Sequence, residues 1–270
     1  MSSSQQKRAA FAALHATGCF VIPNPWDVGS ARYLAGLGFK ALATTSSGFA
    51  WSKGCADNGV SLEQALAHFA EIAASVDVPI NADFEAGFAI APQEVAAHVR
   101  RAVATGIAGV SIEDSTGNAA NPLFDFTLSV ERIAAAREAV AGTGTLLVAR
   151  SEGFIVGRPD LDEMIRRLVA YSEAGADCLY APGIRTREQI SAIVKAVAPK
   201  PVNVLVGGDH ATVAELAALG VRRISVGGAL ARAAWSSFMA AASEIAHEGT
   251  FKRLGTAASF AVVNDMFKKG

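Results

Sequence analysis

Residues 161–181 read LDEMIRRLVAYSEAGADCLYA. In the first part of this stretch apolar residues recur at spacings of three and four, which is typical of a helix with one apolar face. Gly175 then favours a helix stop, because glycine accepts the left-handed conformation that ends many helices. Residues 178–181 form a short apolar run typical of a buried strand. A helix, a glycine stop and a buried strand are the repeating unit of an α/β fold with a parallel sheet.

The same unit recurs along the chain. Eight short apolar runs are predicted strands, at residues 20–23, 41–44, 80–82, 109–112, 146–149, 178–181, 202–205 and 223–226. Helical patterns lie between them, for example at residues 130–140, 161–174, 188–197 and 212–219. Eight such units in 270 residues is the number that closes a TIM (β/α)8 barrel. We therefore predict one barrel domain over residues 1–270.

The end of the chain is more than this barrel needs. Residues 229–247 have the pattern of a long helix, and residues 251–267 that of a further helix with apolar side chains such as Phe251, Leu254 and Phe260. We expect residues 229–270 to form a C-terminal helical extension whose apolar face packs on another subunit. Packing within the same chain, across the base of the barrel, is the alternative.

Composition excludes several classes of protein. Lys and Arg number 24 and Asp and Glu 25, so the formal charge of -1 gives no positive field for nucleic acid or an anionic membrane. Three widely spaced cysteines form neither a disulfide framework nor a zinc site, which favours a reducing cytoplasm. The uncharged residues 9–26 are interrupted by His15, Gly18 and Pro23, so we expect neither a signal peptide nor a membrane span.

Acidic residues follow two neighbouring predicted strands. Asp83, Glu85 and Glu113 lie at strand ends, where barrel enzymes carry their chemistry. Like charges in one cavity repel unless a cation or protons compensate them, and oxygen ligands alone favour Mg²⁺, with Mn²⁺ as a substitute. Asp57, on the loop after the second strand, is placed to hold a water ligand of that ion. The alternative is that Asp83 and Glu113 cap loops or pair with Arg150.

Arg150 and a serine-rich segment predict a site for an anion. The Arg150 guanidinium suits bidentate binding of a carboxylate or phosphoryl group, and Ser46, Ser47 and Gly48 can present hydroxyls and N–H groups opposite it. Serines in a loop are often only turn formers. Trp26 is a candidate wall of the pocket and Asn203 a candidate amide donor to the substrate, although both side chains could equally serve packing. A metal, an arginine and an N–H cradle together describe a site for a 2-oxo acid.

Seven segments at these positions carry a family resemblance. They are residues 23–27 (PNPWD), 43–48 (ATTSSG), 81–87 (NADFEAG), 111–114 (SIED), 148–152 (VARSE), 171–177 (YSEAGAD) and 201–205 (PVNVL). In this order they resemble the isocitrate lyase and phosphoenolpyruvate mutase superfamily, in particular its short bacterial members of the carboxyvinyl-carboxyphosphonate phosphorylmutase-like or methylisocitrate lyase-like kind.

The resemblance implies roles for these residues. Asp83, Glu85, Glu113 and the water-linked Asp57 would form the Mg²⁺ site, and Ser46, Ser47, Gly48 and Arg150 would hold the carboxylate or phosphonate of the substrate. Arg150, Glu113 and Ser46 are the candidate catalytic residues. The shared intermediate of the superfamily is a metal-bound enolate of a 2-oxo acid. Its tail helix is commonly exchanged in dimers that pair into tetramers, which would make this chain a homo-oligomer.

The sequence of the loop after the fourth strand limits the choice among candidate reactions. The lyase branches resemble one another in a Lys-Lys-Cys-Gly loop, whereas residues 114–124 here read DSTGNAANPLF and contain no cysteine. A thiol-assisted cleavage of isocitrate or methylisocitrate is therefore disfavoured. Asn121 echoes the asparagine of the phosphonomutase and phosphonopyruvate hydrolase loops, but their basic residues are missing. Decarboxylation of oxaloacetate needs no general acid at the leaving group, so we predict a Mg²⁺-dependent, oxaloacetate decarboxylase-like lyase of small 2-oxo or 2-hydroxy dicarboxylates.

Two other interpretations stay open. Gly207-Gly208 and Gly227-Gly228 follow the last two strands, where many barrels bind a substrate phosphate. That placement would suit a sugar-phosphate enzyme but leaves the acidic residues unexplained. A barrel without the acid-base cysteine could also be a non-catalytic binding protein.

Overall fold

A computed structural model describes residues 2–268 and contains an eight-stranded parallel sheet. The strands are β1 (Phe20–Ile22), β2 (Leu42–Ala43), β3 (Ile80–Asp83), β4 (Gly109–Glu113), β5 (Leu146–Arg150), β6 (Cys178–Tyr180), β7 (Val202–Leu205) and β8 (Arg223–Ser225). Each pairs with its neighbours in chain order, and β1 pairs with β8. All eight predicted strands are therefore confirmed, each within a residue or two of its expected bounds.

The sheet is nearly closed into a barrel. No ladder joins β1 to β2 among the described residues, but Ala43 N–H donates to the carbonyl of Pro23, just after β1, at 3.1 Å. Asn24 completes the seam: its Nδ2 donates to the Thr44 carbonyl and its Oδ1 accepts from the N–H groups of Val226 and Gly227. The PNPWD segment thus ties both edges of the sheet together, and the predicted TIM barrel is confirmed.

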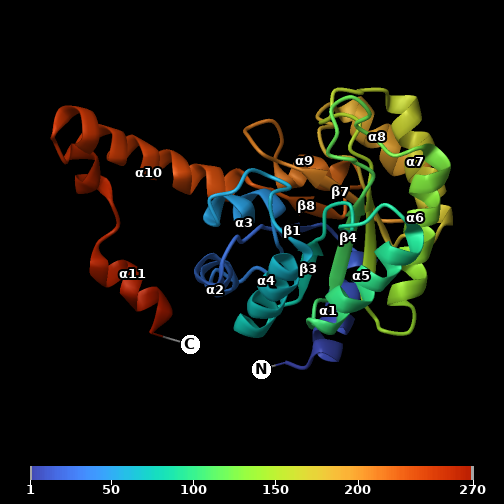
Figure 1. Cartoon of the computed structure of the whole chain (residues 1–270), viewed down its shortest axis with the longest axis horizontal. Helices are drawn as coiled ribbons and strands as arrows, with labels where there is room; N and C mark the ends of the chain where they lie inside the picture. Colours follow the sequence, from blue (N-terminus) through green and yellow to red (C-terminus); the bar gives the residue numbers. More distant parts are fainter. Residues whose placement is uncertain (1, 269–270) are drawn as a thin grey trace.

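Helices cover the outside of the barrel (Figure 1). They are α1 (Ser4–Ala16), α2 (Val28–Gly36), α3 (Ser46–Ser52), α4 (Leu62–Ser75), α5 (Pro92–Ala104), α6 (Phe126–Val140), α7 (Leu161–Glu173), α8 (Arg187–Ala196), α9 (Val213–Ala218), α10 (Ala229–Glu248) and α11 (Phe260–Phe267), with a 3₁₀ turn η1 (Lys252–Thr256). The main core lies between these helices and the outward faces of the strands, so the inward faces and the strand ends are left for polar residues.

The first helix was not expected from the sequence. In α1 the fully buried Phe11 packs with Ile22 and Ala108, and Lys7 Nζ donates to the carbonyls of Ala73 and Val76 at the end of α4, at 2.7 and 2.6 Å. The capping box formed by Ser3 and Gln6 was the available sequence feature. The helix covers the amino-terminal end of the barrel, away from the predicted site (Figure 1).

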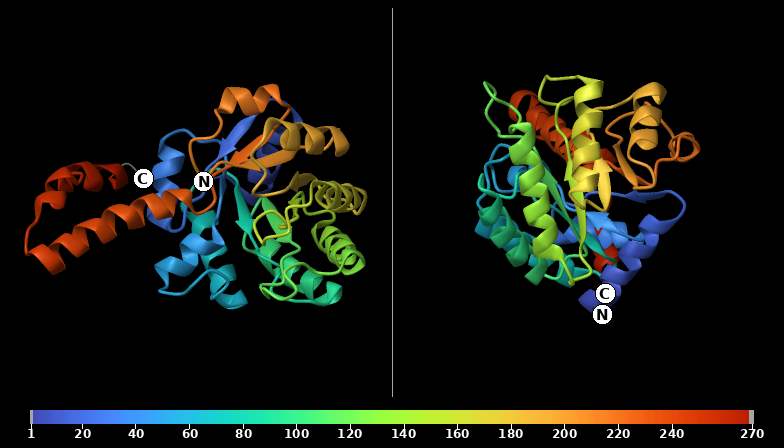
Figure 2. Two further views of the ribbon diagram at one scale, coloured as in Figure 1. Left: turned by 90° about the horizontal axis from the view of Figure 1, so that it is seen from above. Right: turned by 90° about the vertical axis from the view of Figure 1, so that its right-hand side faces the viewer.

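The C-terminal helices leave the barrel as an arm. Helix α10 projects away from the body and α11 turns back towards α2 (Figures 1 and 2). The single helix predicted over residues 251–267 is wrong: η1 ends at Thr256 and a new helix starts at Phe260, because the Ser259 side chain caps it by accepting from Val262 N–H. Met1, Lys269 and Gly270, which the domain prediction includes, lie outside the described residues. No helix within residues 2–268 is long and apolar enough to cross a membrane.

Candidate active site

Arg150 is the centre of the predicted acidic cluster. It ends β5 directly opposite Glu113 at the end of β4. Its Nη1 lies 2.6 Å from Asp83 Oδ1, its Nη2 3.2 Å from Glu113 Oε2, and its Nε 2.8 Å from Glu152 Oε1. Each of the three guanidinium nitrogens therefore contacts a carboxylate. The pairing of Asp83 and Glu113 with Arg150, stated above as the alternative to a metal site, is present in this structure.

Glu85 lies in the loop that follows β3 and adopts a left-handed backbone conformation, with φ of 49°. Its carbonyl accepts from Glu113 N–H at 3.0 Å, which joins the two acidic segments. Burial, followed by repulsion from Asp83 and Asp57, raises the pKa of Glu85 to about 8. Burial also raises the pKa of Glu113 well above its usual value, although Arg150 opposes this. The cluster is thus short of positive charge.

The described residues do not form a preformed metal-binding site. Within residues 2–268, no three His, Cys, Asp or Glu side chains are grouped so that they could hold an ion together. The donor set nevertheless fits Mg²⁺, because all donors are hard oxygens: three carboxylates pair with Arg150, and those of Asp57 and Glu85 lie close enough to interact with it electrostatically. Mg²⁺ usually keeps several waters and binds protein through one or two carboxylates, so it does not require three converging side chains. Asp83, Glu85, Glu113 and Asp57 are the residues that would hold it.

Ser46, Ser47 and Gly48 form the first turn of α3 rather than the loop that was expected. Ser46 N–H donates to Asp83 Oδ2 at 3.0 Å, and the Ser46 hydroxyl reaches Asp57 at 3.5 Å. Ser46 therefore links two of the predicted metal ligands.

Gly48 is held in a crowded position at the start of α3. A Cβ there would meet Thr45 Cγ2 at 2.7 Å, Trp26 Cβ at 3.0 Å and the Cβ of Ala231 at 3.2 Å. Only glycine lets α3 lie so close to the PNPWD segment and to the start of α10.

A cavity of about 180 Å³ opens at the mouth of the barrel. Its lining includes five of the predicted site residues: Ser46, Ser47, Asp57, Asp83 and Arg150. Glu85 lines a smaller neighbouring cavity with His68, and Glu113 a narrow one with Arg150. Gly48, Trp26 and Asn203 line none of these three; Trp26 packs against Gly48, and the buried Asn203 donates to Ser225 Oγ at 2.9 Å.

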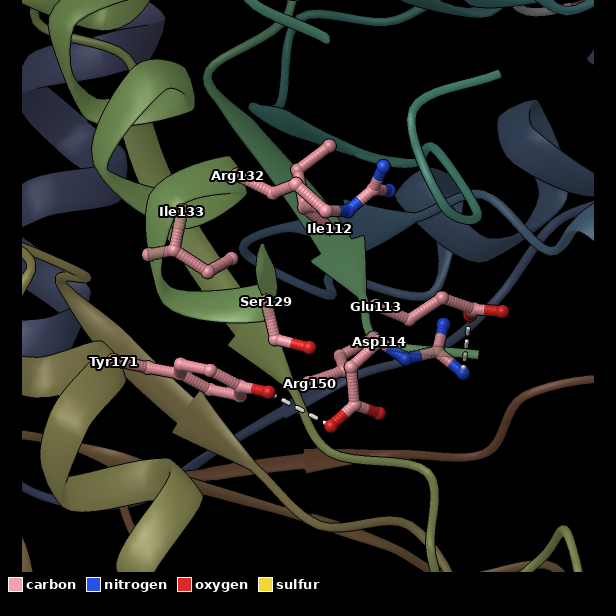
Figure 3. A pocket seen from close by; sticks show the side chains of 8 residues that line it. All are labelled: Ile112, Glu113, Asp114, Ser129, Arg132, Ile133, Arg150 and Tyr171. Carbon is pink, nitrogen blue, oxygen red and sulfur yellow. Dashed lines mark hydrogen bonds and ion pairs between the residues drawn. The ribbon is translucent and has the colours of Figure 1, made fainter. Parts of the chain in front are cut away.

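Two acidic residues of the site were given no role by the sequence. Glu152 holds Nε of Arg150, and its own N–H donates to Asp114 at 2.8 Å. Asp114 is buried and also accepts from the Tyr171 hydroxyl at 2.8 Å (Figure 3). It accepts from Arg167 Nη1 as well, at 3.2 Å. Asp114 lies in the SIED segment and Glu152 in the VARSE segment, so the sequence motifs include both residues. Only the fold shows that Asp114 holds the backbone of Glu152 in place.

A comparison with known families agrees with this geometry. Residues 11–246 match the family described as phosphoenolpyruvate phosphomutase, which covers the barrel and most of α10. The chain belongs to this family. The expected superfamily and the expectation of an enzyme of this kind, whose members are lyases and mutases, are therefore confirmed.

Relatives resemble the chain over most of its length. A presumed lyase/mutase from Burkholderia cenocepacia J2315 is 48% identical, with a TM-score of 0.94 over 98% of this chain and 96% of that one. Phosphonopyruvate hydrolase, solved with oxalate and Mg²⁺, is 25% identical, with a TM-score of 0.84 over 98% of this chain and 95% of that one. The oxaloacetate decarboxylase of Pseudomonas aeruginosa is 28% identical over 82% of this chain and 79% of its own.

Proposed function

We propose that this family member is a Mg²⁺-dependent lyase that decarboxylates oxaloacetate or a closely related small 2-oxo dicarboxylate. The observation that carries the proposal is the excess of buried carboxylates around Arg150, at the mouth of a cavity large enough for a four-carbon acid. The similarity to an oxaloacetate decarboxylase, and to a hydrolase that holds oxalate and Mg²⁺, supports both the metal and the class of substrate.

The residues of the chain would bind and orient the substrate. Ser46 and Ser47 line the cavity and would offer their hydroxyls to the C1 carboxylate of the substrate. Arg150 lines the same cavity and supplies positive charge there. In the reaction the C3–C4 bond breaks, carbon dioxide leaves, and the electron pair remains on the C2–C3 unit until C3 takes up a proton. When bound, Mg²⁺ supplies positive charge where negative charge develops on the 2-oxo oxygen. Glu152 keeps Arg150 in place throughout by its contact with Nε.

The test is pyruvate release from oxaloacetate by purified protein with Mg²⁺, measured against Mg²⁺ alone, which catalyses the reaction slowly. Asp83→Asn should abolish the excess over this background, because the residue contacts both Arg150 and Ser46. Phosphonopyruvate and methylisocitrate serve as parallel substrates. Turnover of either one without oxaloacetate turnover would assign the chain to the phosphonate or the methylisocitrate branch, and Mg²⁺ binding without any turnover would favour a binding protein.

We further propose that residues 229–270 are an extension of a single barrel domain and are exchanged between subunits of a homodimer or homotetramer. The support is the apolar surface of the arm, where Phe238, Phe251 and Phe260 are more than half exposed. We also propose a cytoplasmic location, with which three unpaired cysteines are compatible.

A further inference from the structure

Arg132 is a buried arginine that lines the same narrow cavity as Glu113 and Arg150 (Figure 3). It lies on α6, is 1% exposed, and is the largest fully buried side chain among the described residues. Its Nη1 donates to the carbonyls of Ala89 and Ile90, at 2.5 and 2.8 Å, and its Nη2 donates to the carbonyl of Ala86. Three carbonyls of one loop are thus held by one guanidinium.

That loop, residues 84–91, carries Glu85. Two of its non-glycine residues are left-handed, Glu85 with φ of 49° and Phe88 with φ of 55°. Each such residue costs on the order of 1 kcal/mol and persists only where surrounding contacts enforce it. The hydrogen bonds of Arg132 are contacts of this kind.

Arg132 also contacts the end of the loop that follows β4. The centre of its guanidinium lies 4.1 Å from the centre of the Phe124 ring. Phe124 N–H donates to the Asp114 carbonyl at 2.9 Å, and residues 115–123 lie between these two anchors. One guanidinium therefore connects the segment that carries Glu85 with the base of the loop at residues 115–123.

We propose that Arg132 is a positioning residue that fixes Glu85 for Mg²⁺ and links the metal affinity to the packing of Phe124. This inference rests on the proposed metal site. It assigns no chemical step to Arg132, whose hydrogen bonds are all to the backbone of residues 84–91. Residues that support metal ligands from behind typically change affinity about 10- to 100-fold when they are removed.

Arg8 offers a matched control at the opposite end of the barrel. It too donates to three carbonyls, those of Val103, Ile107 and Thr143, at 2.8 to 3.0 Å. Replacing either arginine by methionine removes three hydrogen bonds from a loop or helix end. The two variants therefore share a general loss of packing and differ in their distance from the metal site.

The experiment is titration of the purified proteins with Mg²⁺ by calorimetry, repeated with Mn²⁺ by electron paramagnetic resonance. We expect Arg132→Met to bind about 10- to 100-fold more weakly than the unchanged protein, and Arg8→Met to bind within about twofold of it. Guanidinium chloride at tens of millimolar should restore affinity to Arg132→Ala but not to Asp83→Asn. Equal affinities of Arg132→Met and the unchanged protein, or an equal loss in Arg8→Met, would overturn the inference.

A double-mutant cycle tests the link to the covering loop. Phe124→Leu should weaken Mg²⁺ binding by itself and should have a smaller effect in the Arg132→Met background. Additive losses would overturn the link. Failure of the unchanged protein to bind Mg²⁺ would contradict both the proposed function and this inference. Weaker Mg²⁺ binding by Arg132→Met, with no oxaloacetate turnover by any variant, would contradict only the proposed reaction.

Discussion

Arg150 compensates the negative charge of the carboxylates around it, which is also the role proposed for a bound cation at this site. Its three ion pairs hold carboxylates from β3, β4 and the segment after β5 within reach of one another. These side chains are at most 15% exposed, so their charges are little screened by solvent. Removing the guanidinium would leave these carboxylates without their positively charged partner, which is among the costliest single changes in a protein.

We therefore predict that Arg150→Met lowers the free energy of unfolding by about 3–5 kcal/mol in the presence of a chelator. Mg²⁺ should then raise the melting temperature of this variant more than that of the unchanged protein, because the ion replaces part of the lost positive charge. Arg137→Met breaks a more exposed pair with Asp177 and should cost no more than about 1 kcal/mol. An equal Mg²⁺ effect on Arg150→Met and the unchanged protein, in thermal unfolding, would contradict a metal site at these carboxylates.

The lowered pKa of His15 predicts how the free energy of unfolding depends on pH. Burial, and secondly the charge of Arg223, lower its pKa to about 4 from 6.5, although the carbonyl of Phe11 accepts from its ring. The unfolded chain then binds a proton between pH 6.5 and 4 that the folded chain does not, so the stabilising contribution is complete above pH 6.5 and is lost as the pH falls towards 4.

The expected size of this effect is about 1.4 kcal/mol for each pH unit in that window. Urea unfolding at pH 7 and pH 5 should show a larger loss for the unchanged protein than for His15→Gln, by about 2 kcal/mol. Carboxyl groups affect both proteins alike, so the difference isolates the histidine. Parallel pH curves for the two proteins would refute the assignment.

At the scale of elements, the sequence predicted the features that depend on local patterns, namely the strands and the polar residues at their ends. Each strand is a short apolar run, and each strand-end motif lies where the barrel rule places it, so Asp83, Glu113 and Arg150 were found without coordinates. Arg132 and Lys7 were missed because an arginine or lysine within a helix has the same local pattern whether it is buried or exposed. The split at Ser259 was missed because the apolar residues on both sides continue one helical spacing.

The contact between α1 and α4 gives a prediction at this scale. Lys7→Met keeps an apolar stem but leaves the carbonyls of Ala73 and Val76 without their donor, and should lower the free energy of unfolding by about 1–3 kcal/mol. Lys195→Met changes an exposed lysine in the last turn of α8 and should have an effect within about 0.5 kcal/mol. Equal unfolding curves in urea would show that the α1 contact does not stabilise the barrel.

At the scale of the molecule, the arm has more apolar surface than one chain covers. Helix α10 has 20 residues, and Ala231 and Glu244 are its buried ones. The apolar side chains that remain exposed on the arm include Trp235, Phe238, Met239, Phe251, Leu254, Phe260 and Val262. Exposed apolar side chains in this number on one projecting segment are typical of an interface between subunits.

A second copy of the chain should therefore cover the arm, and charges placed on it should separate the copies. We predict that the purified protein sediments as a dimer or tetramer, and that Phe238→Glu combined with Phe251→Glu shifts it towards the monomer, because burying two unpaired carboxylates in an apolar interface costs several kcal/mol. Val213→Glu changes a half-exposed apolar residue on α9, outside α10, η1 and α11, and should leave the mass unchanged. A monomeric unchanged protein, or an arm variant of unchanged mass, would contradict subunit exchange. The barrel would in that case keep its own arm, with α11 against α2 of the same chain.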